Sequence, residues 1–122
     1  MLVVDGNNVM GSRPDGWWKD RAGAARRLVE QIGEWATEDV LVYFDGAPHP
    51  GMPAPDHVEV RYATRRGRDA ADDDIAAYVA THDVPSDLRV VTSDADLARR
   101  VRGAGAEVVG ARWLVDRLDG PG

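Results

Sequence analysis

The sequence predicts one α/β domain in which helices cover both faces of a mostly parallel sheet, a three-layer sandwich. Short apolar runs alternate along the chain with segments of helical periodicity, as parallel strands and their crossover helices do. One run, VLVYF at 40–44, is apolar throughout, which is typical of a strand buried on both faces. The chain of 122 residues suits a single domain, which we expect to span residues 1–122.

In the first half of the chain, LVVD at 2–5 is expected to be a strand that ends in a turn, because Asp, Gly and Asn favour turns. Residues 20–36 are expected to be helical, with apolar residues at helical spacing. After the strand at 40–44, the prolines and glycine of 47–55 indicate a loop. Residues 58–63 alternate as a half-exposed strand does.

The second half repeats the alternation. Residues 70–82 carry Ile75, Tyr78, Val79 and His82 on one helical face. LRVVT at 88–92 is expected to be a strand, and 95–102 a helix that is ended by the following glycines. AEVVG at 106–110 is the last expected strand, and 112–118 a final helical turn or two.

Composition excludes several classes of protein. No cysteine is present, so disulfides and thiolate chemistry are excluded and a cytoplasmic location is expected. There is no secretory signal and no apolar run of membrane-spanning length. The three histidines have no zinc spacing. The net charge of −6 hides two basic clusters, Arg61, Arg65, Arg66 and Arg68, and then Arg99, Arg100 and Arg102.

Three of the apolar strands end in aspartate, with Asp5 after the first, Asp45 after the second and Asp94 with Asp96 after the fourth. In such sheets ligands bind beyond the carboxyl ends of the strands, where the strand order reverses. Several carboxylates in one crevice repel each other, and a bound Mg²⁺ or Mn²⁺ removes that repulsion. Singly, each acid has a structural alternative: Asp5 and Asp45 as turn formers, Asp94 as a helix cap, and Asp69 with Asp72 as a capping pair.

The segments VVDGNNV, VYFDG, DAADDDI and VVTSDADLARRVRGAGAEVVG resemble, in this order, the NYN domain of the PIN-like nuclease superfamily, and most closely its bacterial YacP-like branch. The resemblance covers residues 2 to about 111. It implies a five-stranded parallel sheet of order 3-2-1-4-5 and an acidic Mg²⁺ or Mn²⁺ site that hydrolyses RNA phosphodiester bonds as an endonuclease.

Carried over by position, the resemblance implies a set of site residues. Its catalytic residues are Asp5, Asn8, Asp72, Asp73, Asp94 and Asp96, and its metal ligands are Asp5, Asp45, Asp72, Asp94 and Asp96. Some eukaryotic relatives carry a further acid where this chain has Ala98, which leaves open whether Asp96 replaces that acid.

RNA is the expected partner, and a ribosome-associated role is implied by the family alone. Arg61, Arg65, Arg66 and Arg68 are expected to grip backbone phosphates, with a solvated surface as the alternative. Trp17 is a candidate for base stacking, although a tryptophan packs more often than it stacks. We expect a monomer or weak homodimer that does not associate with membranes.

Three other functions are alternatives to a ribonuclease. A PIN-like module that binds RNA or a partner protein without cleaving is the main alternative. A haloacid-dehalogenase-like phosphatase is disfavoured because Asn7 stands where that chemistry needs a second acid, and Lys19 is the only lysine. A toxin of a toxin–antitoxin pair is left open by the sequence.

Overall fold

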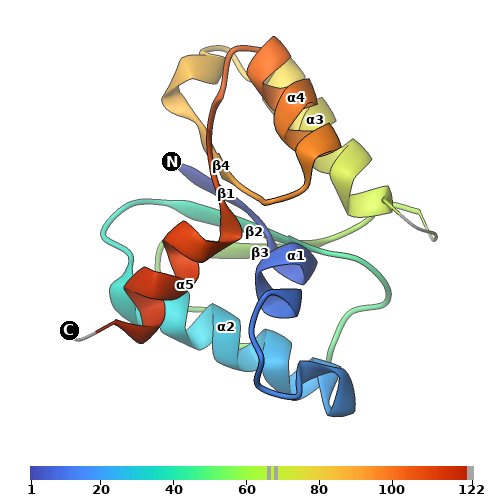
Figure 1. Cartoon of the computed structure of the whole chain (residues 1–122), viewed down its shortest axis with the longest axis vertical. Coiled ribbons are helices and arrows are strands. Elements are labelled where there is room, and N and C mark those ends of the chain that lie inside the picture. Colours follow the sequence, from blue (N-terminus) through green and yellow to red (C-terminus); the bar gives the residue numbers. More distant parts are fainter. Residues whose placement is uncertain (66, 68, 121–122) are drawn as a thin grey trace.

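A five-stranded parallel sheet forms the centre of the structure, a computed structural model that describes residues 1–65, 67 and 69–120 (Figure 1). Every neighbouring pair of strands is parallel, and the strand order is β3-β2-β1-β4-β5, which confirms the expected order. The strands are β1 (Leu2–Asp5), β2 (Val40–Phe44), β3 (Val58–Tyr62), β4 (Arg89–Val91) and β5 (Glu107–Val109).

Helices cover both faces of this sheet, as predicted. The core on one face joins α1, α2 and α5 to the sheet through residues such as Leu28, Phe44 and Leu114. The core on the other face joins α3 and α4 to it through Leu41, Ile75 and others. In Figure 1, α3 and α4 lie together on one side and α1, α2 and α5 on the other. The helices are α1 (Gly6–Gly11), α2 (Arg21–Trp35), α3 (Ala70–Thr81), α4 (Ala95–Gly103) and α5 (Ala111–Asp119), with short 3₁₀ turns η1 (Trp17–Lys19) and η2 (Pro85–Asp87).

The burial of the strands follows their position in the sheet. β2 is buried at all its positions, as expected of an inner strand covered on both faces. β3 forms an edge and alternates between partly buried and exposed residues. The strand order reverses between β1 and β4, because β2 and β3 lie on one side of β1 and β4 and β5 on the other. The crevice at the carboxyl ends of β1 and β4 is therefore the switch point where ligands bind in such sheets.

The segment after β1 differs from the expected turn. Helix α1 begins at Gly6, directly after the strand. A Cβ at this position would lie 2.6 Å from the ring of Phe44 and 2.7 Å from the carbonyl oxygen of Tyr43, so only glycine fits there without a shift. The turn-forming composition of residues 5–8 thus serves a tight strand-to-helix junction against β2.

The other elements agree with the sequence to within one residue at most boundaries. β4 and β5 are each three residues long, shorter than the expected five. Within the described residues, no helix combines the length and the apolar character needed to cross a membrane.

Candidate active site

Asp5 is the buried acid of the switch-point crevice. It ends the central strand and is only 4 % exposed. The hydroxyl of Thr92, which is also buried, donates a hydrogen bond of 2.9 Å to its carboxylate. The backbone N–H of Asp94 donates in turn to the Thr92 oxygen over 3.1 Å. Thr92 was not expected to take part in the site, and the only signal for it is a polar residue at the end of an apolar strand.

The pKa values of two acids show how closely the carboxylates lie. Burial raises the pKa of Asp5 to about 7; the hydrogen bond from Thr92 opposes this shift, and the charges of Asp72 and Asp45 add to it. The pKa of Asp72 is raised to about 6, first by burial and then by the charges of Asp94, Asp69 and Asp45. Five acids from four separate segments, Asp69 and Asp72 being in the same one, therefore lie close together at this edge of the sheet.

A cavity of about 580 Å³ opens beside these acids and is called here the acidic crevice. Carboxylates and guanidinium groups line it together, from α3, α4 and the loop before α3: Arg65, Asp69, Asp72, Asp73, Asp94, Asp96, Leu97, Arg99 and Arg100. Asp5 lies buried next to this lining and interacts with it through the charge of Asp72. The combination brings both an anionic centre and cationic groups to one opening.

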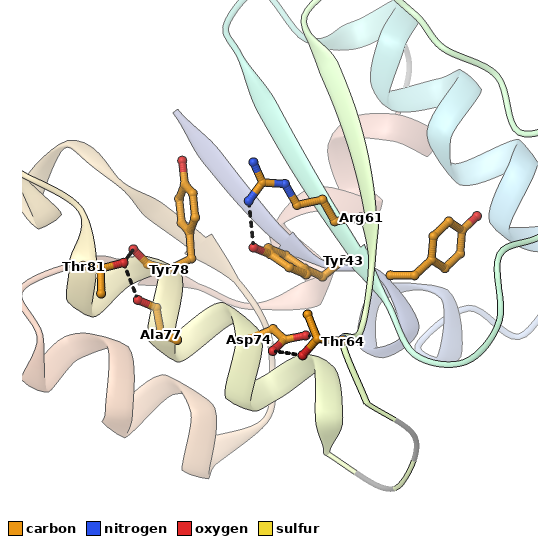
Figure 2. Close-up of a pocket in the computed structure, with 8 residues that line it drawn as sticks. Tyr43, Arg61, Thr64, Asp74, Ala77, Tyr78 and Thr81 are labelled. Carbon is orange, nitrogen blue, oxygen red and sulfur yellow. Dashed lines mark hydrogen bonds between the residues drawn. The ribbon is translucent and has the colours of Figure 1, made fainter.

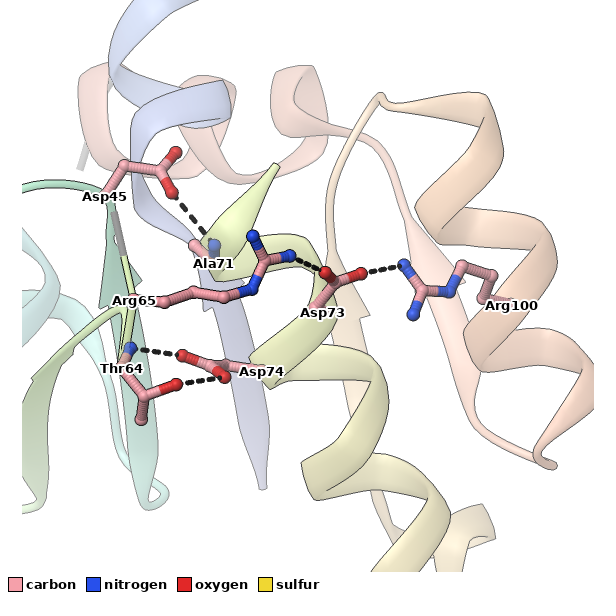
Figure 3. Close-up of polar contacts among 7 residues, drawn as sticks. All are labelled: Asp45, Thr64, Arg65, Ala71, Asp73, Asp74 and Arg100. Atoms are coloured by element: carbon pink, nitrogen blue, oxygen red, sulfur yellow. Dashed lines mark hydrogen bonds and ion pairs between the residues drawn. The ribbon is translucent and has the colours of Figure 1, made fainter. Parts of the chain in front are cut away.

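Asp94 and Asp45 each have a structural role in this arrangement. Asp94 caps α4, accepting a 2.9 Å hydrogen bond from the N–H of Leu97. Asp45, at the end of β2, accepts one of 2.9 Å from the N–H of Ala71 in the first turn of α3 (Figure 3). The structural alternative in which Asp69 caps α3 does not hold, because Asp69 adopts a left-handed conformation (φ 62°) and its side chain makes no capping bond.

Asp73 and Asp96 are more exposed and are paired with arginines. Asp73 accepts hydrogen bonds from Arg65 and from Arg100, the second over 2.9 Å, and these bonds lower the pKa of Asp73 (Figure 3). Asp96 pairs with Arg99 on the surface of α4. Ala98 is buried two residues further along the helix. Since residues two apart point to opposite sides of a helix, Asp96 does not occupy the place of an acid at that position.

The two asparagines of α1 form hydrogen bonds to the loops on both sides of β1. The side-chain oxygen of Asn7 accepts the N–H of Asp45 over 2.7 Å, and that of Asn8 accepts the N–H of Ser93 over 2.8 Å. Asn8 was expected in the site. Asn7 was noted only because a haloacid-dehalogenase-like phosphatase would need an acid at its position. Each holds the loop that follows a neighbouring strand.

The donor chemistry of these side chains suits a hard cation, since all the acids offer oxygen ligands. In the described residues, no three acidic or histidine side chains are grouped closely enough to form a metal centre as they stand. The pKa of Asp72 is raised by burial and by the charges of Asp94, Asp69 and Asp45, as expected of a carboxylate that a cation would stabilise. The set therefore fits Mg²⁺ or Mn²⁺ in kind and requires side-chain rotation to close around it.

The residues expected to bind RNA are divided among different surfaces. Arg65 lies in the acidic crevice, and Arg61 lies in a separate pocket on the same face of the sheet. Arg66 and Arg68 are outside the described residues. Trp17 packs against the core, with the guanidinium of Arg21 5.4 Å from its ring centre, whereas Trp18 is 57 % exposed. Arg99 and Arg100, which line the crevice, were noted as a basic cluster but not assigned to the site.

Comparison with known proteins adds to this geometry. The sequence model described as the YacP-like NYN domain matches residues 2–120. The chain belongs to the YacP-like NYN family. Two crystal structures of Rae1 (YacP) from Bacillus subtilis have the same fold. One, of a tryptophan-to-leucine mutant, is 25 % identical with a TM-score of 0.77, covering 97 % of this chain and 74 % of that one.

The second Rae1 structure is 24 % identical with a TM-score of 0.76, over 98 % of this chain and 73 % of that one. No curated protein matches the chain. The YacP-like NYN domain has the PIN-like nuclease fold, so its family indicates a ribonuclease kind of function with RNA as the substrate. PIN-like nucleases generally use divalent metals, and this is consistent with the oxygen-rich crevice.

Proposed function

We propose that this YacP-like NYN domain is a ribonuclease that hydrolyses RNA phosphodiester bonds with Mg²⁺ or Mn²⁺ held in the acidic crevice. The observation that carries the proposal is the convergence of Asp5, Asp72, Asp94 and Asp45, where burial first, and the charges of neighbouring carboxylates second, raise the pKa of Asp5 and of Asp72. Such an arrangement costs folding free energy, and a functional site is a common reason for a cluster of this kind.

Asp5, Asp72 and Asp94 are the proposed ligands. Asp5 accepts a hydrogen bond from Thr92, and Asp94 uses one oxygen as a helix cap and retains the other. Asp72 is brought near both by the first turn of α3. A bound divalent cation supplies a water of lowered pKa and neutralises charge that develops on the phosphate. Asp45 and Asp96 are weaker candidates, because one is bonded to the start of α3 and the other to Arg99.

The remaining polar residues of the crevice would position the substrate. Asn8 holds the loop that carries Asp94, so we assign it a positioning role. Arg65 and Arg100 bracket Asp73, and both guanidinium groups can move to an RNA phosphate, because Asp73 is more than 40 % exposed. We therefore propose that Asp73 holds these two arginines in position until an RNA phosphate displaces its carboxylate from them. We also propose that the enzyme is an endonuclease, which cleaves bonds inside the RNA chain.

A cleavage assay tests the proposal directly. Wild-type protein is incubated with a mixed pool of RNA, with Mn²⁺, with Mg²⁺ or with EDTA, and the ends of the products are mapped. We expect cleavage only with metal, and we expect Asp5→Asn to abolish it while Asp116→Asn, an exposed acid on α5 paired with Arg112, does not. RNA left intact by the wild-type protein with every divalent metal would contradict the proposed activity.

The non-catalytic alternative has one observation in its favour. Asp45 and Asp94 already serve as hydrogen-bond acceptors for helix starts, and Asp73 and Asp96 are paired with arginines. A module that only binds RNA would retain these contacts. It would bind single-stranded RNA equally well with and without metal and would cut none of it.

A further inference from the structure

A second cavity lies beside the acidic crevice and is called here the tyrosine pocket. It has a volume of about 430 Å³, within the range of ordinary ligand sites, and lies between the edge strand β3 and helix α3. Tyr43, Arg61, Thr64, Asp74, Tyr78 and Thr81 are among the residues that line it (Figure 2). The ring of Tyr43 is almost fully buried, so the partly exposed ring of Tyr78 is the main aromatic surface.

The charges of the tyrosine pocket are already balanced. Arg61 pairs with Glu59, donates to the Tyr43 hydroxyl over 3.3 Å, and has its guanidinium carbon 5.5 Å from the centre of the Tyr78 ring. Asp74 accepts the N–H and the hydroxyl of Thr64 over 2.7 and 2.9 Å. The pocket therefore does not favour a phosphate, because Arg61 is already paired with Glu59 and the carboxylate of Asp74 would repel an anion. A neutral planar group would instead contact an aromatic ring and the plane of the Arg61 guanidinium group.

The two cavities adjoin through consecutive residues. Thr64 and Asp74 line the tyrosine pocket, and their chain neighbours Arg65 and Asp73 line the acidic crevice. Consecutive Cα atoms are about 3.8 Å apart, and on neither segment does a residue intervene between the two linings. A nucleotide whose phosphate lies in the crevice therefore has this pocket next to it.

We infer that the tyrosine pocket binds an unpaired base of single-stranded RNA, stacked on Tyr78 and Arg61, next to the phosphate that is cleaved in the acidic crevice. This inference rests on the proposed ribonuclease function and adds a base subsite to it. It assigns Arg61 to a base, whereas the sequence suggested a backbone phosphate. Aromatic and guanidinium planes stack on any base, so the subsite gives affinity without a strict sequence requirement.

Binding measured in metal-free buffer tests the subsite apart from cleavage. The probes are a short fluorescent oligouridylate and an abasic oligomer of the same length, titrated with wild type, Tyr78→Leu and Tyr78→Phe. Loss of one stacked base should weaken oligouridylate binding roughly 5- to 100-fold in Tyr78→Leu. Tyr78→Phe keeps the ring and should bind as the wild type does, and all three proteins should bind the abasic oligomer equally.

Two further variants make the result decisive. If Tyr78→Leu does not fold, Arg61→Gln, which changes a partly exposed side chain, should show the same selective loss for oligouridylate. Trp18→Leu, which removes the most exposed tryptophan outside the pocket, should leave binding unchanged. Unchanged oligouridylate binding in the pocket variants, an equal loss for both probes, or a base-selective loss in Trp18→Leu alone would overturn the inference. Failure of the wild type to cleave RNA with metal would instead contradict the ribonuclease function.

Discussion

Thr92 connects two acids of the crevice, because its hydroxyl donates to Asp5 and accepts the N–H of Asp94. Thr92→Val keeps the shape of the side chain and removes two hydrogen bonds, the one to the buried carboxylate of Asp5 and the one from the partly buried N–H of Asp94. We expect the free energy of unfolding to fall by about 1–3 kcal/mol and the pKa of Asp5 to rise further. Denaturant titration and carboxyl NMR titration measure the two effects. Thr81→Val, whose hydroxyl bonds only to carbonyls of its own helix, is the control. An unchanged pKa of Asp5 would contradict the role given to Thr92.

The raised pKa of Asp5 makes the stability of the metal-free protein depend on pH. Between the unfolded value of 3.8 and the folded value of about 7, the folded protein holds a proton that the unfolded chain releases. The contribution of Asp5 to stability is therefore greatest near pH 4 and declines as the pH rises to 7, by up to about 4 kcal/mol. Asp5→Asn cannot titrate at this position. Its unfolding free energy should therefore increase relative to that of the wild type as the pH rises from 4 to 7.

The control for this effect is Asp116→Asn, which removes an exposed acid on α5 and should follow the wild-type pH profile. Denaturant titrations of the three proteins in EDTA, between pH 4 and 8, provide the comparison. Parallel profiles for Asp5→Asn and wild type would show that Asp5 ionises normally.

At single residues, the sequence predicted the acids better than the groups that hold them. Asp5 and Asp94 end or follow recognisable strands, so their convergence could be expected from a parallel sheet, whereas Asp72, in the first turn of α3, was implied by the family resemblance. Thr92 and Asn7 act through hydrogen bonds between segments far apart in the chain, 87 residues in the case of Thr92 and Asp5. Spacing in the sequence contains no information about such contacts.

Among the elements, the junction of β1 and α1 is under a tight steric limit. Gly6→Ala would place a methyl group 2.6 Å from Phe44 and 2.7 Å from the Tyr43 carbonyl, and one of these is backbone. We expect a loss of about 1–3 kcal/mol, as in other overpacked cores. Gly103→Ala is a matched control, because nothing lies within 4 Å of its added Cβ and its conformation suits alanine.

Denaturant titration of the two glycine variants makes this comparison. Gly103→Ala should be neutral or stabilising by up to about 1 kcal/mol, since alanine is the better helix residue. Equal stability of the two variants would mean that Gly6 can shift without cost.

The elements also show where sequence patterns mislead. The helices at 20–36 and 70–82 and the strand at 40–44 have long, regular apolar patterns, and the structure places them within one residue of those bounds. Helix α1 is six residues long and contains two glycines and two asparagines, so its composition favours a turn. It is helical because Val9 and Met10 are buried in the core, a tertiary effect that local propensity does not include.

For the whole molecule, the energy of carboxylate repulsion predicts stabilisation by metal. A cation that binds only the folded protein at about 100 times its dissociation constant adds about 2.7 kcal/mol, which for a domain of this size raises the melting temperature on the order of 10 °C. Melting in EDTA and in increasing Mn²⁺ measures it. Asp94→Asn keeps the helix cap, since Asn caps as well as Asp, and should reduce the shift. Melting that is insensitive to metal would contradict the ligand assignment.

The global topology was predictable only in part. Alternating strands and helices indicated a parallel sheet, but the order β3-β2-β1-β4-β5 followed from the resemblance to a family and not from the patterns themselves. The relation between the two cavities was not predictable, because it depends on consecutive residues facing different openings.

The bonds from Asn7 and Asn8 have a consequence for solvent access to the backbone. The N–H groups of Asp45 and Ser93 lie in loops, yet each donates to an asparagine side chain of the same helical turn. Both amide protons should therefore exchange with deuterium far more slowly than those of ordinary loops, and they should slow or quicken together. Asn7→Ala should release Asp45 alone if the two bonds break independently, and both amides if α1 opens as one unit. Hydrogen exchange at these two positions thus measures whether the loops that follow β2 and β4 open together or separately.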